Sequence, residues 1–353
     1  MHEAILYEPL EKKAVRCTAC KIRCVVKEGG VGVCGVRQNK DGKLYLIVYG
    51  KASAVNIDPI EKKPLYHFLP GTEIFSIGTV GCNFACSFCQ NWDLSQLART
   101  LRERLMKEKH VEDIELEVKQ YGYHLPPKKV IELCLEKKVP SIAYTYNEPV
   151  IFFEYLHDIS TLARPHGIRT LFVSNGYESE EALDMASGYL DAMNIDLKSF
   201  RDNFYKKICK ARLQPVLDTI QEVHKRGIWL EVTTLVIPGQ NDSEAELKDI
   251  AAFIASVDKN IPWHISAFFP AYKMKDVPPT SRAALEKAYD IGLEADLNYI
   301  YLGNIQDEKR SATYCPNCGA ALIRRSGYRP WIESTFENGA CTRCRTQIPG
   351  VWQ

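Results

Sequence analysis

Three cysteines within eight residues constrain this chain more than any other feature. Cys82, Cys86 and Cys89 follow an apolar stretch of strand length, residues 74–80. We therefore expect the three thiols on one loop that leaves the end of a buried strand. Three thiolates are one fewer than a closed zinc site uses, and they suit a four-iron cluster with one iron left open. A chance group of cysteines or a partial zinc knuckle is the alternative.

Length and charge narrow the class of protein. The chain has 353 residues, enough for one large domain with an appendage or for two to three domains. The formal net charge of +1 gives no overall attraction to nucleic acid or to a membrane. No apolar stretch approaches the roughly 20 residues of a membrane span, and the N-terminus lacks the pattern of a signal peptide. We therefore expect a cytoplasmic protein without a membrane partner.

Eleven of the thirteen cysteines fall into three compact groups, a pattern typical of metal ligation in a chain without export signals. The first group is Cys17, Cys20, Cys24 and Cys34. A structural zinc site, an auxiliary iron–sulfur cluster and unliganded thiols all remain open for it, because four thiolates serve either metal. Outside the groups, the sequence pattern predicts that Cys134 is a buried apolar residue, and Cys209 has no assigned role.

The last group forms two C-x2-C knuckles near the C-terminus. Cys315 and Cys318 make the first knuckle, and Cys341 and Cys344 make the second. Two such turns close a tetrahedron of four thiolates, so residues 312–353 are expected to form a zinc-ribbon-like domain. Rubredoxin-like iron is the main alternative. Four thiolates leave no open position, so the metal would be structural.

Between these groups, apolar strand-length segments alternate with helix-length intervals. This alternation predicts an α/β fold with a parallel sheet, curled into a partial or full (β/α) barrel. Ligands bind at the carboxyl ends of such strands. The polar residues expected there are Asn147, Glu148, Ser174, Asn175, Asp196, Lys198 and Thr234. The charge-dense residues 99–119 are predicted to form a solvated amphipathic helix, with a lid or docking surface as the alternative.

The cysteine loop and its neighbours resemble a known family. The stretch Gly-Cys-Asn-Phe-Ala-Cys-Ser-Phe-Cys-Gln-Asn-Trp at residues 81–92 is similar to the cluster loop of radical S-adenosylmethionine (SAM) enzymes, more narrowly of AmmeMemoRadiSam-system proteins. These are relatives of pyruvate formate-lyase activating enzyme. The four-cysteine N-terminal segment and Asp196-Leu197-Lys198 resemble the same family. The resemblance implies a Cys-rich segment at 1–70, a radical SAM barrel at 71–311 and the C-terminal domain at 312–353.

The resemblance also implies roles for the strand-end residues. Glu148 would meet the amino group of SAM, and Lys198, beside Asp196, would meet its carboxylate. Ser174 and Asn175 would hydrogen-bond the ribose or carboxylate. Asn147 replaces a glycine of relatives in the SAM-contacting segment, Phe88 would pack on the adenine, and Thr234 ends a strand near it. Two plainer interpretations stay open: Asp196 and Lys198 pair with each other, and Glu148 caps the following helix.

The implied activity is reductive cleavage of SAM by a [4Fe-4S] cluster, which yields a 5′-deoxyadenosyl radical that takes hydrogen from a substrate. The motifs do not indicate the substrate. An activase acting on a partner protein is one hypothesis. Carbon–carbon bond formation on a small molecule or an RNA base, with Memo-like and AMMECR1-like partners, is another. Ferredoxin or flavodoxin would donate electrons. The non-enzyme alternative is a metal-stabilised nucleic-acid-binding or scaffold protein.

Overall fold

The computed structural model describes residues 1–353 and divides into two compact units. The first unit contains residues 1–57 and 74–191, and the second contains residues 58–73 and 192–353. This division differs from the boundaries expected at residues 70 and 311. Residues 58–73 belong with the second unit because the backbone N–H groups of Tyr66 and His67 donate to the carboxylate of Glu231, at 3.0 and 2.8 Å.

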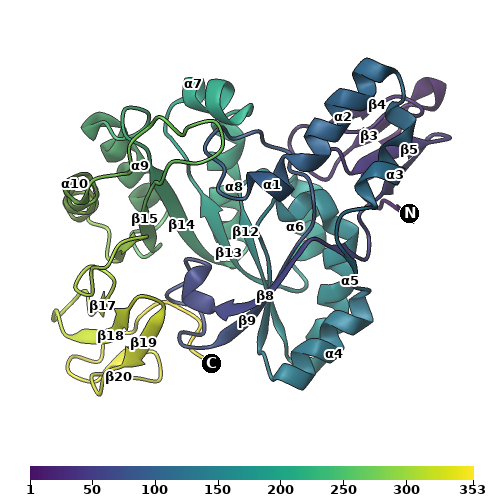
Figure 1. The fold of residues 1–353 in the computed structure, drawn as a ribbon. Coiled ribbons are helices and arrows are strands. Elements are labelled where there is room, and N and C mark those ends of the chain that lie inside the picture. The colour runs from purple at the N-terminus through teal and green to yellow at the C-terminus, as the bar shows by residue number, and fades with distance from the viewer. The chain divides into compact units, whose positions relative to one another are not determined.

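The first unit contains a parallel sheet, as the alternation predicted. Strands β9 (Glu73–Gly78), β11 (Ser141–Tyr144) and β12 (Arg169–Ser174) pair in parallel, with β11 in the middle. Helix α4 (Pro127–Lys137) leads into β11, and α5 (Phe153–Ala163) leads into β12 (Figure 1). Helix α6 (Glu180–Ala186) follows β12. The carboxyl ends of the three strands therefore lie at one edge of the sheet, where the expected ligand residues follow.

The N-terminal segment forms small antiparallel sheets that carry the first cysteine group. One sheet has the order β1-β6-β5 and the other has the order β2-β3-β4. The strands are β1 (His2–Glu3), β2 (Tyr7–Pro9), β3 (Val15–Cys17), β4 (Val25–Val26), β5 (Arg37–Lys40) and β6 (Lys43–Leu46). Short strand β7 (Lys51–Ala52) pairs with β10 (Tyr123–His124), and β8 spans Ala54–Pro59.

The charge-dense stretch is helical. After α1 (Trp92–Ser95), helix α2 (Leu97–Glu108) buries Leu101 and Leu105, and α3 (Ile114–Val118) buries both of its end residues. The charged side chains occupy the remaining positions, so the interpretation as an amphipathic helix is confirmed. The stretch contains two helices because Lys109 adopts a left-handed conformation, φ 63°, that ends α2.

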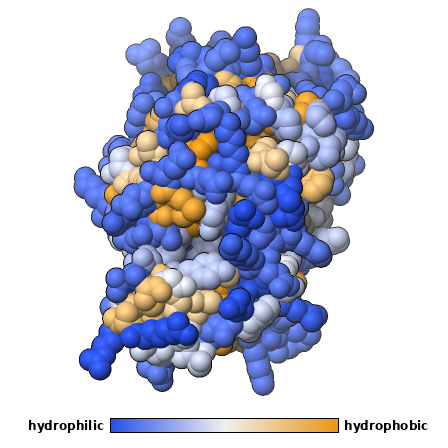
Figure 2. Space-filling view, turned by 90° about the vertical axis from the view of Figure 1, so that its left-hand side faces the viewer, coloured by the Kyte–Doolittle hydropathy of each residue, from blue (hydrophilic) through white to orange (hydrophobic).

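The second unit continues the parallel pattern. Strands β13 (Leu190–Asp196), β14 (Trp229–Val236), β15 (Trp263–Ala267) and β16 (Ile300–Gly303) pair in that order. The helices of this unit include α7 (Asp202–Phe204), α8 (Gln214–Lys225), α9 (Glu244–Val257) and α10 (Arg282–Glu294). Figure 2 shows that the outer surface on the α10 side is mostly hydrophilic, as expected of helices that turn their apolar faces inward.

The strand register gives these four strands one polar face. Asp196 pairs with Thr233, Thr233 with His264, and His264 with Tyr301, so these side chains line up on the same side. Trp263 lies on the other side, where it contacts α10 at Gly292. Polar groups at the carboxyl ends of β13–β16 are therefore kept on the face opposite to α10.

The C-terminal segment packs onto this sheet and shares its core. Strands β17 (Thr313–Tyr314), β18 (Ala321–Ser326) and β19 (Arg329–Ile332) form one small sheet, and β20 (Phe336–Glu337) pairs with β21 (Ala340–Cys341). A buried cluster joins Leu322, Ile323 and Phe336 to Tyr299 and Tyr301. No helix is both long and apolar enough to cross a membrane.

Candidate cluster and cofactor site

The three-cysteine loop lies between β9 and α1, at the carboxyl end of a buried strand as predicted. Cys82 and Cys86 are buried and Cys89 is half-buried, and none forms a disulfide. The sulfur of Cys89 lies 3.2 Å from the hydroxyl of Ser95. Burial, with the nearby carboxylate of Glu148 as a second cause, raises the pKa of the Cys82 thiol. Three cysteine sulfurs outside any disulfide on one short loop match the donor set of a cluster with an open iron.

Asn147 fixes the start of this loop. Its Nδ2 donates to the carbonyl of Gly81 at 2.8 Å and to the hydroxyl of Thr79 at 3.1 Å, and its Oδ1 accepts from the Thr79 N–H at 3.1 Å. These bonds tie the end of β11 to the end of β9. The side chain of Asn147 thus positions the cluster loop, a role that the sequence did not suggest.

Glu148 is buried beside the end of β12. Its carboxylate accepts from the N–H of Asn175 at 2.8 Å and from the hydroxyl of Ser174 at 3.1 Å. It also caps the following 3₁₀ helix through the N–H of Val150 at 3.4 Å, so the plainer interpretation holds alongside the other contacts. The Ser174 hydroxyl also lies 2.5 Å from Glu178, and its single proton is shared between the two carboxyl groups. Burial, and then the neighbouring charge of Glu178, raise the pKa of Glu148 well above its usual value.

Two amide side chains connect the cluster loop to the end of β12. Asn175 Nδ2 donates to Asn83 Oδ1 at 2.8 Å, although the two residues are 92 positions apart. Asn83 Nδ2 and Asn175 Oδ1 are buried without a hydrogen-bond partner. Such orphaned groups are costly unless a ligand satisfies them. With Glu148 they give a buried donor, an acceptor and an acid beside the three thiols, which fits a cluster with a zwitterionic amino-acid group. Phe88 is buried within the same loop.

The remaining expected ligands lie in the second unit. Lys198 Nζ pairs with Asp196 Oδ2 at 2.5 Å, so these two side chains meet as the plainer interpretation held. Thr234 does not join them. It lies on the apolar side of the sheet, where its hydroxyl donates to the carbonyl of Leu197 and accepts from Trp263 Nε1, both at 3.0 Å. Its neighbour Thr233 occupies the polar face with Asp196.

The sequence reasoning missed a buried hydrogen-bonded pair on the same polar face. His264 Nε2 lies 2.6 Å from Glu231 Oε2, and both side chains are almost completely buried. His264 also lines an open cavity of about 310 Å³, together with Glu61, Tyr66, Ser266 and Tyr328. Alternating polar residues at positions 231 and 233 of an otherwise apolar strand were the available signal.

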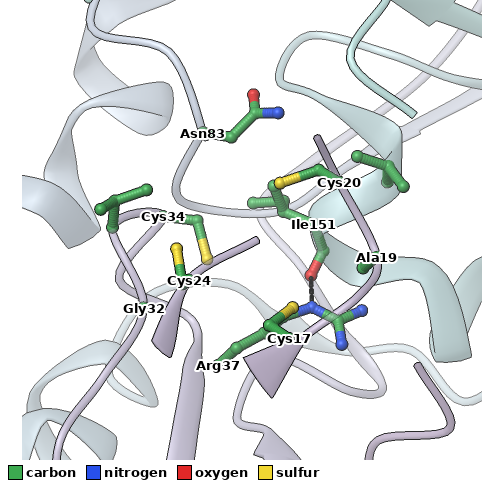
Figure 3. A pocket seen from close by; sticks show the side chains of 11 residues that line it. Cys17, Ala19, Cys20, Cys24, Gly32, Cys34, Arg37, Asn83 and Ile151 are labelled. Atoms are coloured by element: carbon green, nitrogen blue, oxygen red, sulfur yellow. Dashed lines mark hydrogen bonds between the residues drawn. The ribbon is translucent and has the colours of Figure 1, made fainter. Parts of the chain in front are cut away.

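The first cysteine group surrounds a small cavity in the first unit. The sulfurs of Cys17, Cys20, Cys24 and Cys34 approach it from several directions (Figure 3). Arg37 and Asn83 also line this cavity. Arg37 is fully buried, and its guanidinium forms a bidentate pair with Glu154 at 3.1 and 2.7 Å.

The C-terminal cysteines form a tighter group. All four sulfurs lie within 4.8 Å of one another. Cys315 and Cys344 are 3.4 Å apart at sulfur, and Cys318 and Cys341 are 3.6 Å apart. Hydrogen bonds from the hydroxyl and N–H of Thr346 lower the pKa of Cys344 to about 6. The sequence-predicted metal group is therefore assembled.

Comparison with known proteins shows the family. Residues 76–251 match the model of the Radical SAM superfamily. The chain belongs to this superfamily. It is 42% identical over 350 residues to an uncharacterized protein of Methanocaldococcus jannaschii, with 99% of each chain covered. The matched residues contain the three-cysteine loop and all of the expected strand-end ligands, and the family indicates an enzyme that uses a [4Fe-4S] cluster and SAM.

More distant relatives have names that state an activity. A putative glycyl-radical enzyme activating enzyme of Methanocaldococcus jannaschii is 24% identical over 231 residues, covering 64% of this chain and 77% of the relative. GTP 3′,8-cyclase of Limosilactobacillus fermentum is 22% identical over 271 residues, covering 70% and 74%. Among solved structures, a domain of pyruvate-formate lyase-activating enzyme from Bacteroides vulgatus has a TM-score of 0.41 at 22% identity, covering 46% of this chain and 98% of that one.

Proposed function

We propose that this radical SAM enzyme acts in the manner of AmmeMemoRadiSam-system proteins and takes a hydrogen atom from a substrate still to be identified. The observation that carries the proposal is the juxtaposition, within one unit, of three cysteines outside any disulfide with the buried carboxyl of Glu148 and the unsatisfied amide atoms of Asn83 and Asn175. Cys82, Cys86 and Cys89 would hold a [4Fe-4S] cluster. When bound, that cluster supplies one electron for cleavage of SAM to methionine and a 5′-deoxyadenosyl radical.

The chain's own residues bind and orient SAM. Glu148 receives the ammonium group, and Asn175 Oδ1 accepts a further hydrogen bond from it. Glu148 and Glu178 lie on either side of the Ser174 hydroxyl, and burial raises the pKa of both carboxyls. A cation entering this pocket favours the ionised carboxylate, so binding displaces a proton. Burial of these groups also keeps water from the reacting atoms.

The second unit presents polar strand ends of its own, as a partial or full (β/α) barrel would. Lys198, beside Asp196, is the cation there that suits a carboxylate. Thr233, rather than Thr234, is the threonine of β14 on the polar face. The cavity beside His264 would admit the substrate, since it opens at the carboxyl ends of β15 and β16.

The C-terminal group would hold a structural zinc ion. A tetrahedral site with Zn–S distances of about 2.3 Å places its sulfurs roughly 3.8 Å apart. The observed separations of 3.4 and 3.6 Å agree with that spacing. All four positions are filled by protein, so this ion would stabilise the fold without taking part in the reaction.

Two classes of substrate remain for the radical. The similarity to a glycyl-radical activating enzyme favours a partner polypeptide as substrate, and the similarity to GTP 3′,8-cyclase favours bond formation on a small molecule or an RNA base. Memo-like and AMMECR1-like proteins are the proposed partners, with ferredoxin or flavodoxin as electron donor in the cytoplasm. Anaerobic capture followed by identification of bound protein or RNA separates the two classes.

The proposed chemistry is tested by reconstituting the protein anaerobically with iron and sulfide, then adding dithionite and SAM. We expect 5′-deoxyadenosine from the wild type and from Cys134→Ala, a buried cysteine outside the groups. Cys86→Ala should form none. Absence of 5′-deoxyadenosine from the wild type, or equal formation by Cys86→Ala, would contradict the proposal and favour a binding or scaffold protein.

A further inference from the structure

We propose that Cys17, Cys20, Cys24 and Cys34 hold a second four-iron cluster, and not a zinc ion, next to the three-cysteine loop. The proposal goes beyond the SAM chemistry and does not depend on it. It rests on the spacing of the sulfurs, on the backbone around them, and on the lining of the cavity that they surround.

Sulfur spacing separates this group from the C-terminal one. The C-terminal sulfurs are drawn to within 4.8 Å of one another, as a single small ion requires. No three sulfurs of the N-terminal group are gathered this closely, and the same is true of Cys82, Cys86 and Cys89. In a four-iron cluster each thiolate binds a different iron, so the sulfurs stand farther apart than around one ion. In the distances between its sulfur atoms, the N-terminal group thus resembles the three-cysteine loop rather than the C-terminal group.

The backbone around these cysteines is arranged for thiolates. The N–H groups of Ala19, Ile22 and Val36 donate to the sulfurs of the cysteines two residues earlier, and Val33 N–H donates to Cys24. The same pattern occurs at the C-terminal knuckles, where Ala320 donates to Cys318. Such donors stabilise a charged sulfur. Four thiols arranged in this way, three of them buried and Cys24 half-buried, are metal ligands rather than ordinary core residues.

The cavity between the sulfurs is larger than a single ion needs. Its volume is about 10 Å³, enough to admit a sphere of about the size of a water molecule, whereas sulfurs at about 2.3 Å from one zinc ion leave no such space. Its other walls are mostly apolar or backbone, from residues such as Ala19, Val33 and Ile151. The exceptions are Arg37, already paired with Glu154, and Asn83, which is 1% exposed and has an Nδ2 without a partner. An N–H donor facing a sulfide is a common support for iron–sulfur clusters.

This second cluster would sit directly beside the first. Asn83 follows Cys82 in the loop and lines the N-terminal cavity at the same time. The backbone of Gly81 passes so close to the carbonyl of Cys34 that a Cβ there would lie 2.6 Å from it. With four cysteine ligands the second cluster has no open iron, so SAM would bind only at the loop cluster.

Metal counting on the full chain tests the proposal. Three variants are reconstituted anaerobically with iron, sulfide and zinc: the triple variant Cys82→Ala/Cys86→Ala/Cys89→Ala, the double variant Cys20→Ala/Cys24→Ala, and the control Cys134→Ala. We expect about eight iron atoms and one zinc in the wild type and the control, and about four iron atoms and one zinc in each of the other two. After reduction, the electron paramagnetic resonance signal of the triple variant should not change on adding SAM.

A triple variant with two zinc ions and no iron would overturn the proposal, and so would one with a single zinc and no iron. If only the proposed SAM chemistry is wrong, the result is distinguishable. The electron paramagnetic resonance signal of the double variant would then not respond to SAM, while the triple variant would still contain about four iron atoms. The C-terminal zinc serves as an internal check of folding. The triple variant leaves the N-terminal group untouched, so the result does not depend on whether the double variant folds.

Discussion

At the scale of single residues, the acid pair beside Ser174 is the most telling feature of the first unit. Glu148 and Glu178 are both buried, and no cationic side chain pairs with Glu148. Burial raises the pKa of each, and the charge of Glu178 raises that of Glu148 further. A buried carboxyl with a raised pKa lowers the stability of the fold. Proteins retain such destabilising groups where they bind a ligand.

We expect Glu148→Gln to stabilise the ligand-free protein above neutral pH and to weaken SAM binding by at least about tenfold. The folded protein holds a proton that the unfolded chain releases near the usual pKa of 4.5, so this residue's contribution to stability falls as pH rises above that value. The loss of melting temperature between pH 5 and pH 8 should therefore be smaller in the variant. The exposed Glu180→Gln should change neither quantity. An unchanged affinity for SAM in Glu148→Gln would exclude the assigned role.

At the scale of elements, close backbone approach fixes the cluster loop against the N-terminal segment. Gly81 has φ +94°, and a Cβ there would lie 2.6 Å from the carbonyl of Cys34 and 2.9 Å from Val36. Gly29 shares the positive φ, at +72°, but nothing lies within 4 Å of its would-be Cβ. A comparison of substitutions at the two glycines therefore separates the effect of backbone strain from that of steric contact.

Alanine substitutions at these two glycines should differ sharply. Gly29→Ala should cost about 1 kcal/mol of unfolding free energy through backbone strain alone. Gly81→Ala should cost at least about 2 kcal/mol more, because the carbonyl it meets cannot move aside freely, and it should lower the iron content after reconstitution. Urea unfolding and iron analysis measure both effects. Equal losses in the two variants would mean that the loop does not depend on this approach.

Strand β14 depends on a buried carboxylate. Glu231 accepts hydrogen bonds from the backbone of Tyr66 and His67, from Trp229 Nε1 and from His264. Burial by itself would raise the pKa of Glu231, but the bond to His264 and the other donors lower it overall. Its contribution to stability is therefore present at neutral pH and is lost as the pH falls from 4.5 through the lowered value.

We expect Glu231→Ala to lower the unfolding free energy by about 3 kcal/mol at pH 7, because four donors lose their acceptor. The difference from the wild type should shrink toward pH 3. Glu244→Ala, which changes an exposed residue at the start of α9, should lower the unfolding free energy far less. A loss at position 231 as small as that at position 244 would show that the segment 58–73 is held by other contacts.

At the scale of the whole molecule, three cysteine groups divide between two units. The cluster loop and the N-terminal group belong to the first unit, and the C-terminal group belongs to the second. The C-terminal group shares a buried cluster with Tyr66, Tyr299 and Tyr301. Loss of its metal should therefore affect the second unit without removing iron from the first.

Cys318→Ala tests this division, since the exposed position of Cys318 leaves no cavity behind. We expect zinc to fall from about one per chain to none, the melting temperature to fall by about 5 °C or more, and the iron content to stay unchanged. Arg343→Ala, a change between the knuckle cysteines, should retain zinc. Retention of zinc by Cys318→Ala, or loss of iron with it, would contradict the assignment.

The sequence alone determined the cysteine groups and the order of parallel strands. Spacings such as C-x3-C-x2-C fix which thiols one loop can present, and apolar periodicity marks strands that then pair as predicted from β9 to β12 and from β13 to β16. Both are properties of neighbouring residues, so local chain geometry suffices to read them.

Only the tertiary structure decided which side chains meet. The Asn83–Asn175 bond joins residues 92 positions apart, and the register of β14 puts Thr233 on the polar face and Thr234 on the other. A shift of one residue in a strand exchanges its faces, and spacing along the chain does not reveal that register. The sulfur separations that distinguish the C-terminal group from the N-terminal one likewise depend on packing. The cysteine spacing allows either metal, and the distance to which the fold draws the four sulfurs together is what separates the two sites.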